Sequence, residues 1–103
     1  MIQLETRYLT MVHNILQHWV PNFEVWAFGS RVHKRGLKPF SDLDLALITK
    51  QPLDNSRYGM IKEAFVESDL PFRVDIVDWS LLNDSFKTII LKEHEQIQTP
   101  ASN

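Results

Sequence analysis

The pattern of apolar and polar positions along the chain predicts three helices besides a short turn. Near the N-terminus apolar residues recur at helical spacing until Pro21, which predicts an amphipathic first helix. A second helix is predicted over about 55–68, and a third begins near Ser80 as its N-cap. The positions expected to face inward are Leu4, Tyr8, Met11, Val12, Ile15, Leu16 and Trp19, then Tyr58, Ile61, Ala64 and Phe65, and finally Leu82, Phe86, Ile89 and Ile90.

Three short stretches, over residues 23–28, 42–48 and 72–77, have the length and composition of strands. Their alternation with helices predicts an α/β (α+β) fold, a small mixed sheet flanked by helices. The first two strands are joined by only a short helix and a loop through Pro39, so we expect them to pair antiparallel. Residues 98–103 are predicted to form a polar tail.

Composition narrows the class of protein. A chain of 103 residues with 44% hydrophobic content suits a single domain, 1–103, with one modest core. A net charge of −2 argues against binding to duplex nucleic acid, and the absence of cysteine excludes disulfides and thiol chemistry. No apolar run approaches the length of a membrane span and no signal-peptide pattern is present, so we expect a cytoplasmic protein.

The stretch beginning at Gly29 is the first candidate for binding chemistry. Gly29 ends a strand and Ser30 stands where a helix would start, so Ser30 is predicted to be an N-cap in a turn that can hold a phosphate. Arg31, Lys34 and Arg35 add positive charge beside it. Taken alone, the turn is also compatible with an ordinary strand-to-helix connection, and its cations with solvated surface charges.

Three aspartates are the candidate catalytic and metal-binding residues. Strand alternation puts Asp42 and Asp44 on one face, although aspartate is depleted in strands and like charges repel there. Asp75 joins them if its strand pairs beside theirs, and three carboxylates can hold two Mg²⁺ ions about 3.5–4 Å apart for phosphoryl or nucleotidyl transfer. Without Asp75, the pair of Asp42 and Asp44 is also compatible with the solvated edge of a strand. Asp78 is expected to be a strand-end or capping residue, with a third-ligand role as the alternative.

The remaining candidate ligands carry no comparable signal. The four histidines, His13, His18, His33 and His94, lack zinc-ligand spacing and are assigned no metal. Three tryptophans, Trp19, Trp26 and Trp79, are candidates for an interface, but core packing is the favoured interpretation of each. The oligomeric state, homomeric or heteromeric, stays open.

The order Gly29-Ser30-Arg31, then Ser41-Asp42-Leu43-Asp44-Leu45, then a strand with Asp75 resembles the nucleotidyltransferase superfamily typified by DNA polymerase beta. At this length the chain is most similar to the minimal nucleotidyltransferases (MNT), whose signature reads Gly-Ser-Arg-Ala-Arg-Gly and then Ser-Asp-Ile-Asp-Leu. The resemblance covers about residues 23–78. It departs after Arg31, because His33 and Lys34 replace the second arginine and the glycine; Arg35 and Gly36 are the candidates to substitute for them.

The resemblance implies a polymerase beta-like palm and a specific partner. MNT proteins are commonly paired with a HEPN-domain protein, often a ribonuclease toxin, and transfer AMP from ATP to one of its tyrosines. Gly29 and Ser30 would then hold the ATP phosphates, Asp42 and Asp44 would bind two Mg²⁺ ions, and Asp75 would complete the site. Larger relatives add domains for base and acceptor, so we expect the partner to supply part of this site.

Two alternatives stay open. One is an antitoxin that blocks its HEPN partner without catalysis, and the other is a small-molecule adenylyltransferase of the antibiotic-modifying type. No residue set in the sequence reads a nucleobase, so nucleotide specificity also stays open.

Overall fold

A four-stranded mixed sheet lies at the centre of the computed structural model, which describes residues 2–101. The strands are β1 (Glu24–Phe28), β2 (Leu43–Ile48), β3 (Val74–Asp78) and β4 (Glu95–Gln98). The helices are α1 (Thr6–Trp19), α2 (Ser30–His33), α3 (Asn55–Val66) and α4 (Asp84–Lys92), with a 3-10 helix η1 at Trp79–Leu81. The strand order is β3-β2-β1-β4. Strand β1 pairs antiparallel with β2, as predicted, while β2 and β3 are parallel. The predicted α/β class is therefore confirmed.

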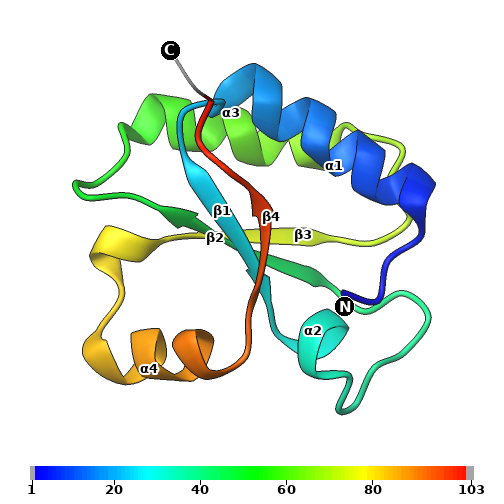
Figure 1. The fold of residues 1–103 in the computed structure, drawn as a ribbon. Coiled ribbons are helices and arrows are strands. Elements are labelled where there is room, and N and C mark those ends of the chain that lie inside the picture. Colours follow the sequence, from blue (N-terminus) through cyan, green and yellow to red (C-terminus); the bar gives the residue numbers. More distant parts are fainter. Residues whose placement is uncertain (1, 102–103) are drawn as a thin grey trace.

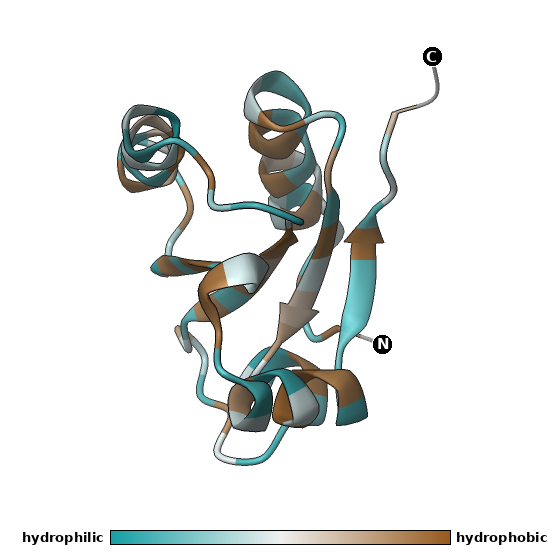
Figure 2. Cartoon of the chain, turned by 90° about the vertical axis from the view of Figure 1, so that its left-hand side faces the viewer, coloured by the Kyte–Doolittle hydropathy of each residue, from teal (hydrophilic) through white to brown (hydrophobic). Residues whose placement is uncertain are grey.

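The sheet has two unlike faces. Helices α1 and α3 lie on one side of it, and α2 and α4 on the other (Figure 1 and Figure 2). Side chains alternate across a strand, so every second residue of β1 points toward α1 and α3. The core between them is formed by Val12, Leu16, Val25, Ala27, Leu43, Leu45, Leu47, Ile61, Phe65 and Ile76. Of the inward positions predicted for the first two helices, all but Met11 and Ala64 belong to this core or pack against it.

The second face carries aromatic residues rather than an aliphatic core. Trp26 stacks on His94 with ring centroids 4.0 Å apart and meets Trp79 edge-on at 5.2 Å. Both tryptophans are half-buried, which agrees with the packing role favoured for them. Helix α4 contributes little core here, because Ile90 is its one buried residue. The expectation that Ile89 faces the sheet is wrong: its side chain is 66% exposed.

Two boundaries near the C-terminal end also differ from the prediction. Ser80 lies within η1 and Asn83 is the N-cap of α4, its side chain accepting a hydrogen bond from the Phe86 amide. The polar residues of β4 form an edge strand beside β1, mostly hydrophilic in Figure 2. Gln98, predicted to begin a tail, is buried and its Nε2 donates to the carbonyls of Val20 and Phe23. In residues 2–101 no helix has the length and apolarity that a membrane crossing needs.

Candidate active site

A row of side chains crosses the second face where β1 ends and β2 begins. The β1–β2 register places Phe28 opposite Asp44, and the β2–β3 register places Asp44 beside Asp75. Residues paired in this way project to the same face. Asp42 precedes Asp44 by two positions, so it projects to that face as well. The structure therefore brings together the three acids predicted as catalytic and metal-binding residues.

Gly29 lies against the central acid of this row. Its φ is +80°, a left-handed conformation that glycine adopts readily, and a Cβ atom there would lie 2.2 Å from Asp44 Oδ2. Any side chain would collide with the carboxylate. The turn and the acid are thus in direct contact, which the sequence pattern alone did not show.

The environment of Asp44 opposes its charge. Burial raises its pKa, and the neighbouring carboxylates of Asp75 and Asp42 raise it further, to about 6; Arg73 acts in the opposite direction. A carboxyl group whose ionised form is disfavoured in this way is stabilised strongly when a cation lies beside it. The electrostatics therefore suit a binding site for positive charge.

Arg73 lies between the outer two acids. Its Nη2 atom is 3.2 Å from Asp42 Oδ2 and 3.2 Å from Asp75 Oδ2, and its side chain is 69% exposed. The three acids supply only oxygen donors, as Mg²⁺ requires, and the guanidinium marks a point where one cation reaches two of them. Within residues 2–101, however, no three His, Cys, Asp or Glu side chains converge closely enough to hold a metal ion. The oxygen donors of the three acids fit Mg²⁺ in kind, while Arg73 occupies the point between Asp42 and Asp75.

The short helix α2 begins differently from the prediction. Gly29 is its N-cap and Ser30 its first helical residue, so Ser30 does not cap the helix with its side chain. The first hydrogen bonds within it run from the amides of Val32 and His33 to the Gly29 carbonyl. The amides of Ser30 and Arg31 therefore precede the first bonded turn, as at any helix start.

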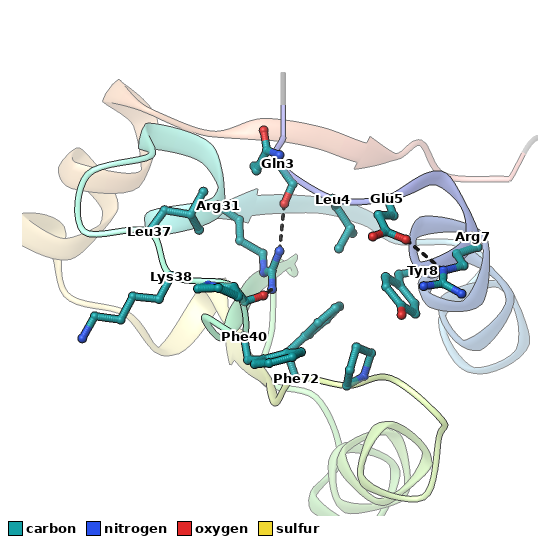
Figure 3. A pocket seen from close by; sticks show the side chains of 12 residues that line it. Gln3, Leu4, Glu5, Arg7, Tyr8, Arg31, Leu37, Lys38, Phe40 and Phe72 are labelled. Carbon is teal, nitrogen blue, oxygen red and sulfur yellow. Dashed lines mark hydrogen bonds and ion pairs between the residues drawn. The ribbon is translucent and has the colours of Figure 1, made fainter.

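Arg31, predicted to bind the nucleotide, is used by the fold instead. Its guanidinium donates to the carbonyls of Ser41, Gln3 and Pro39 and lies over the Phe72 ring, 4.3 Å from its centroid. It is part of the wall of a hollow of about 640 Å³, which is lined by the N-terminal segment, the loop before β2 and the segment before β3. Figure 3 shows these side chains. The Arg31 side chain is 6% exposed. This placement of Arg31 does not support a contact between its guanidinium and a nucleotide phosphate.

The other two predicted cations also lie apart from the acids' row. Lys34 ends α2 in a left-handed conformation and is exposed. Arg35 is paired with Glu93, with Nη2–Oε1 and Nη1–Oε2 distances of 2.6 and 3.3 Å, and its amide donates to His33 Nδ1. Gly36 has a φ of +69° and supports the loop by its conformation. Of the predicted nucleotide-binding residues, Gly29 lies against Asp44, and Ser30 follows it directly in the chain.

Asp78 has the capping role expected for it. It is the N-cap of η1 and accepts hydrogen bonds from Ser80, from Thr49 Oγ1 and from the Leu53 amide. It lies three positions after Asp75, an odd number, so strand alternation turns it to the opposite face. Asp75 is the acid that joins the row.

Sequence comparison agrees with this geometry. Residues 3–101 match the family described as polymerase beta, nucleotidyltransferase. The chain belongs to this nucleotidyltransferase family. It is also 48% identical over 97 residues to a probable protein adenylyltransferase, MntA, of Haemophilus influenzae, a match that covers 94% of this chain and 84% of the relative.

Solved structures share the fold of this nucleotidyltransferase. A toxin–antitoxin complex with AMP-PNP matches with a TM-score of 0.72 and 21% identity, covering 88% of this chain and 73% of the other. The MNT antitoxin in complex with a tri-AMPylated HEPN toxin of Shewanella oneidensis matches with a TM-score of 0.69 and 18% identity, covering 93% and 73%. A putative nucleotidyltransferase matches at 0.54 and 23%, covering 86% and 96%.

Sequence reasoning left two features of this nucleotidyltransferase without a role. Arg73 lies two positions before Asp75, and nothing in the local sequence indicates that it bridges two acids. Phe28 is the last residue of the predicted strand 23–28, and its ring meets Phe86 edge-on, with centroids 5.8 Å apart, beside Gly29. The signal for Phe28 was its position directly before the turn.

Proposed function

We propose that the chain is a Mg²⁺-dependent protein adenylyltransferase that transfers AMP from ATP to a tyrosine of a HEPN-domain partner, and so acts as an antitoxin. The observation that carries the proposal is the row of Asp42, Asp44 and Asp75 in contact with the turn at Gly29. Carboxylates gathered beside a backbone turn suit a triphosphate and its metal ions. The family match narrows the chemistry to nucleotidyl transfer.

Each residue of the row has a defined task in this reaction. The tyrosine oxygen attacks the α-phosphorus of ATP, the bond from that phosphorus to the bridging oxygen breaks, and pyrophosphate leaves. Asp75 takes up the phenolic proton, and Asp42, Asp44 and Asp75 are the residues that would hold Mg²⁺. Bound Mg²⁺ would offset the phosphate charge and favour the ionised hydroxyl. The Gly29–Ser30 turn orients the phosphates with its free amides.

The partner and the acceptor are supported by the relatives. The Haemophilus influenzae protein at 48% identity is named a probable protein adenylyltransferase, and the Shewanella oneidensis structure pairs an MNT antitoxin with an AMPylated HEPN toxin. We extend both features to this chain. The reaction uses ATP as donor, and we place it in the cytoplasm.

Labelled transfer tests the proposal directly. The chain, Mg²⁺ and ATP labelled at the α-phosphate are incubated with and without the HEPN protein encoded nearby. We expect label on a tyrosine of that protein, no label when the chain carries both Asp42→Asn and Asp44→Asn, and unchanged labelling with Asp69→Asn, which removes an exposed carboxylate from the loop after α3. Label on a small molecule alone would identify the antibiotic-modifying alternative.

A rival function is inhibition by binding alone. It is favoured by the ion pairs of Arg73 with Asp42 and Asp75, which occupy the acids that catalysis needs. Toxin neutralisation in cells separates the two functions. If the Asp42→Asn, Asp44→Asn variant neutralises the HEPN partner as well as the parent does, transfer is not the mechanism.

A further inference from the structure

A second hollow adjoins the catalytic row on the side of α4. It has a volume of about 270 Å³ and is lined by Phe28, Gly29, Phe86, Ile89 and Glu93, among others. Gly29 therefore borders both this hollow and the carboxylate of Asp44. A molecule whose phosphates lie at the turn has the hollow as its neighbour.

The walls of the hollow are apolar and accessible. Phe28 and Phe86 meet edge-on at an interplanar angle of 83°, so the two rings form a corner rather than a closed stack. Ile89 is 66% exposed and Phe86 37% exposed, which leaves their surfaces free to cover a planar group. Aromatic rings of this kind stack on any of the nucleobases, because every base has a flat π face.

The rim of the hollow carries a charged acceptor. Glu93 is held there by Arg35, whose hydrogen bonds lower the pKa of the Glu93 carboxyl below its usual range and keep it ionised. An ionised carboxylate only accepts hydrogen bonds. Adenine presents a donor in its N6 amine, and guanine in its N1–H and N2 amine, so the carboxylate suits the edge of either purine.

We propose that this hollow, the base pocket, receives the nucleobase of the nucleotide, and that Glu93 accepts a hydrogen bond from its edge. Phe28 and Phe86 supply the stacking surface and Ile89 covers the open side. The proposal rests on the proposed function in one respect, since it takes the triphosphate to lie at the Gly29–Ser30 turn. It gives the nucleobase a place in the site and gives Arg35 the task of holding Glu93.

The stacking part is tested by comparing ATP with inorganic tripolyphosphate, which has the phosphates without a base. Dissociation constants with Mg²⁺ are measured for the parent chain, Phe86→Ala, Ile89→Ser and the control Val66→Ser, which alters a residue 80% exposed on α3. We expect both pocket variants to weaken ATP about tenfold, as loss of base stacking does, and to leave tripolyphosphate unchanged. Equal weakening of both ligands, or of neither, would overturn the base pocket. Circular dichroism and melting curves confirm that each variant is folded.

The hydrogen bond to Glu93 is tested with Glu93→Gln, and with Glu63→Gln at an exposed position on α3 as its control. Glu93→Gln should reduce the preference for ATP over tripolyphosphate about fivefold, whereas Glu63→Gln should retain it. A preference that Glu93→Gln leaves intact would overturn the hydrogen bond to Glu93. Transfer is scored separately: base-dependent binding without label on the HEPN partner would contradict the proposed function and leave the base pocket standing.

Discussion

Gly29 is the residue at which backbone conformation and the catalytic row depend on each other most directly. Gly29→Ala should destabilise the protein by about 2 kcal/mol or more, because it combines a left-handed φ with a collision against Asp44. Gly36→Ala shares the positive φ but meets open space, so it should cost only about 1 kcal/mol. Gly59→Ala, in α3, should stabilise by about 0.5–1 kcal/mol. Urea unfolding measures all three, and equal losses at Gly29 and Gly36 would contradict the role of the collision.

Asp44 makes the metal-free protein sensitive to pH. Its folded pKa of about 6 lies above its ordinary value, so folding favours the protonated form and stability is lost as pH rises from about 4 to 6. In EDTA, Asp44→Asn should therefore be more stable than the parent at pH 7 by about 1–2 kcal/mol, after allowance for solvent screening.

The difference between Asp44→Asn and the parent should vanish near pH 4, and adding Mg²⁺ should stabilise the parent alone. Denaturant unfolding at several pH values measures this difference in the free energy of unfolding. A variant that is less stable than the parent at pH 7 in EDTA would show that Asp44 is not held against its charge.

At the residue scale, the sequence predicts those features of the site that depend only on the spacing of residues along one strand. Asp42 and Asp44 share a face because strands have a period of two, and this needs no tertiary information. Arg31 could not be predicted in the same way. Its three carbonyl partners belong to Gln3, Pro39 and Ser41, which are brought together by the fold rather than by the motif.

At the scale of elements, β4 shows where periodicity loses its information. The residues Glu95-Gln96-Ile97-Gln98 have neither the apolar alternation nor the β-branched composition of a buried strand. They form a strand because β1 offers an unpaired edge, which is a property of the assembled sheet. The three strands with apolar alternation were predicted, and the one without it was missed.

Gln98 is the residue through which β4 is fixed to the chain before β1. Gln98→Leu should cost about 1–3 kcal/mol, because it leaves the carbonyls of Val20 and Phe23 without the amide that they accept from. Gln96→Leu, an exposed change on the same strand, should be within about 0.5 kcal/mol of the parent. Thermal melts compare the two, and similar melting temperatures for both variants would contradict the bonding role of Gln98.

Asp78 connects three elements and should make stability fall in acid. Burial alone would raise its pKa, but hydrogen bonds from Leu53, Ser80 and Thr49 outweigh it and hold the pKa below its usual value. Its stabilisation is thus complete above the unfolded pKa of about 3.9 and is lost as pH falls through the folded pKa. Asp78→Asn should lose about 1–3 kcal/mol at pH 7.

The gap between the Asp78→Asn variant and the parent should narrow below about pH 4. Chemical denaturation between pH 3 and 7 provides the measurement. A gap that stays constant over this range would mean that the carboxyl gains nothing from its donors in the folded state.

At the scale of the whole molecule, stability and chemistry are assigned to different faces of one sheet. The face under α1 and α3 holds the aliphatic core, while the face with α2 and α4 holds the acids, the turn and the base pocket. Substitutions on the second face can therefore change binding while the core stays intact.

This separation predicts how ATP and Mg²⁺ affect unfolding. Together, at about one hundred times their dissociation constant, they should stabilise the folded state by about 2.7 kcal/mol and raise the melting temperature by roughly 10–20 °C. The Asp42→Asn, Asp44→Asn variant should lose most of this shift, whereas Val66→Ser should keep it. Thermal melts with ATP alone, Mg²⁺ alone and both provide the measurement, and a full shift in the double variant would contradict the assignment of the acids.

The pairing of Phe28 with Asp44 and of Asp44 with Asp75 has a consequence for folding errors. A slip of β2 by one residue against its neighbours would send Asp42 and Asp44 into the core under α1 and α3 and expose Leu43, Leu45 and Leu47. Such a misaligned chain would bury unpaired charges and lose its apolar contacts, so it would not persist as a compact species. A molecule that folds stably therefore has Asp42, Asp44 and Asp75 on one face of the sheet. The strand pairing that builds the site also excludes a stable misfolded form in which the acids are displaced.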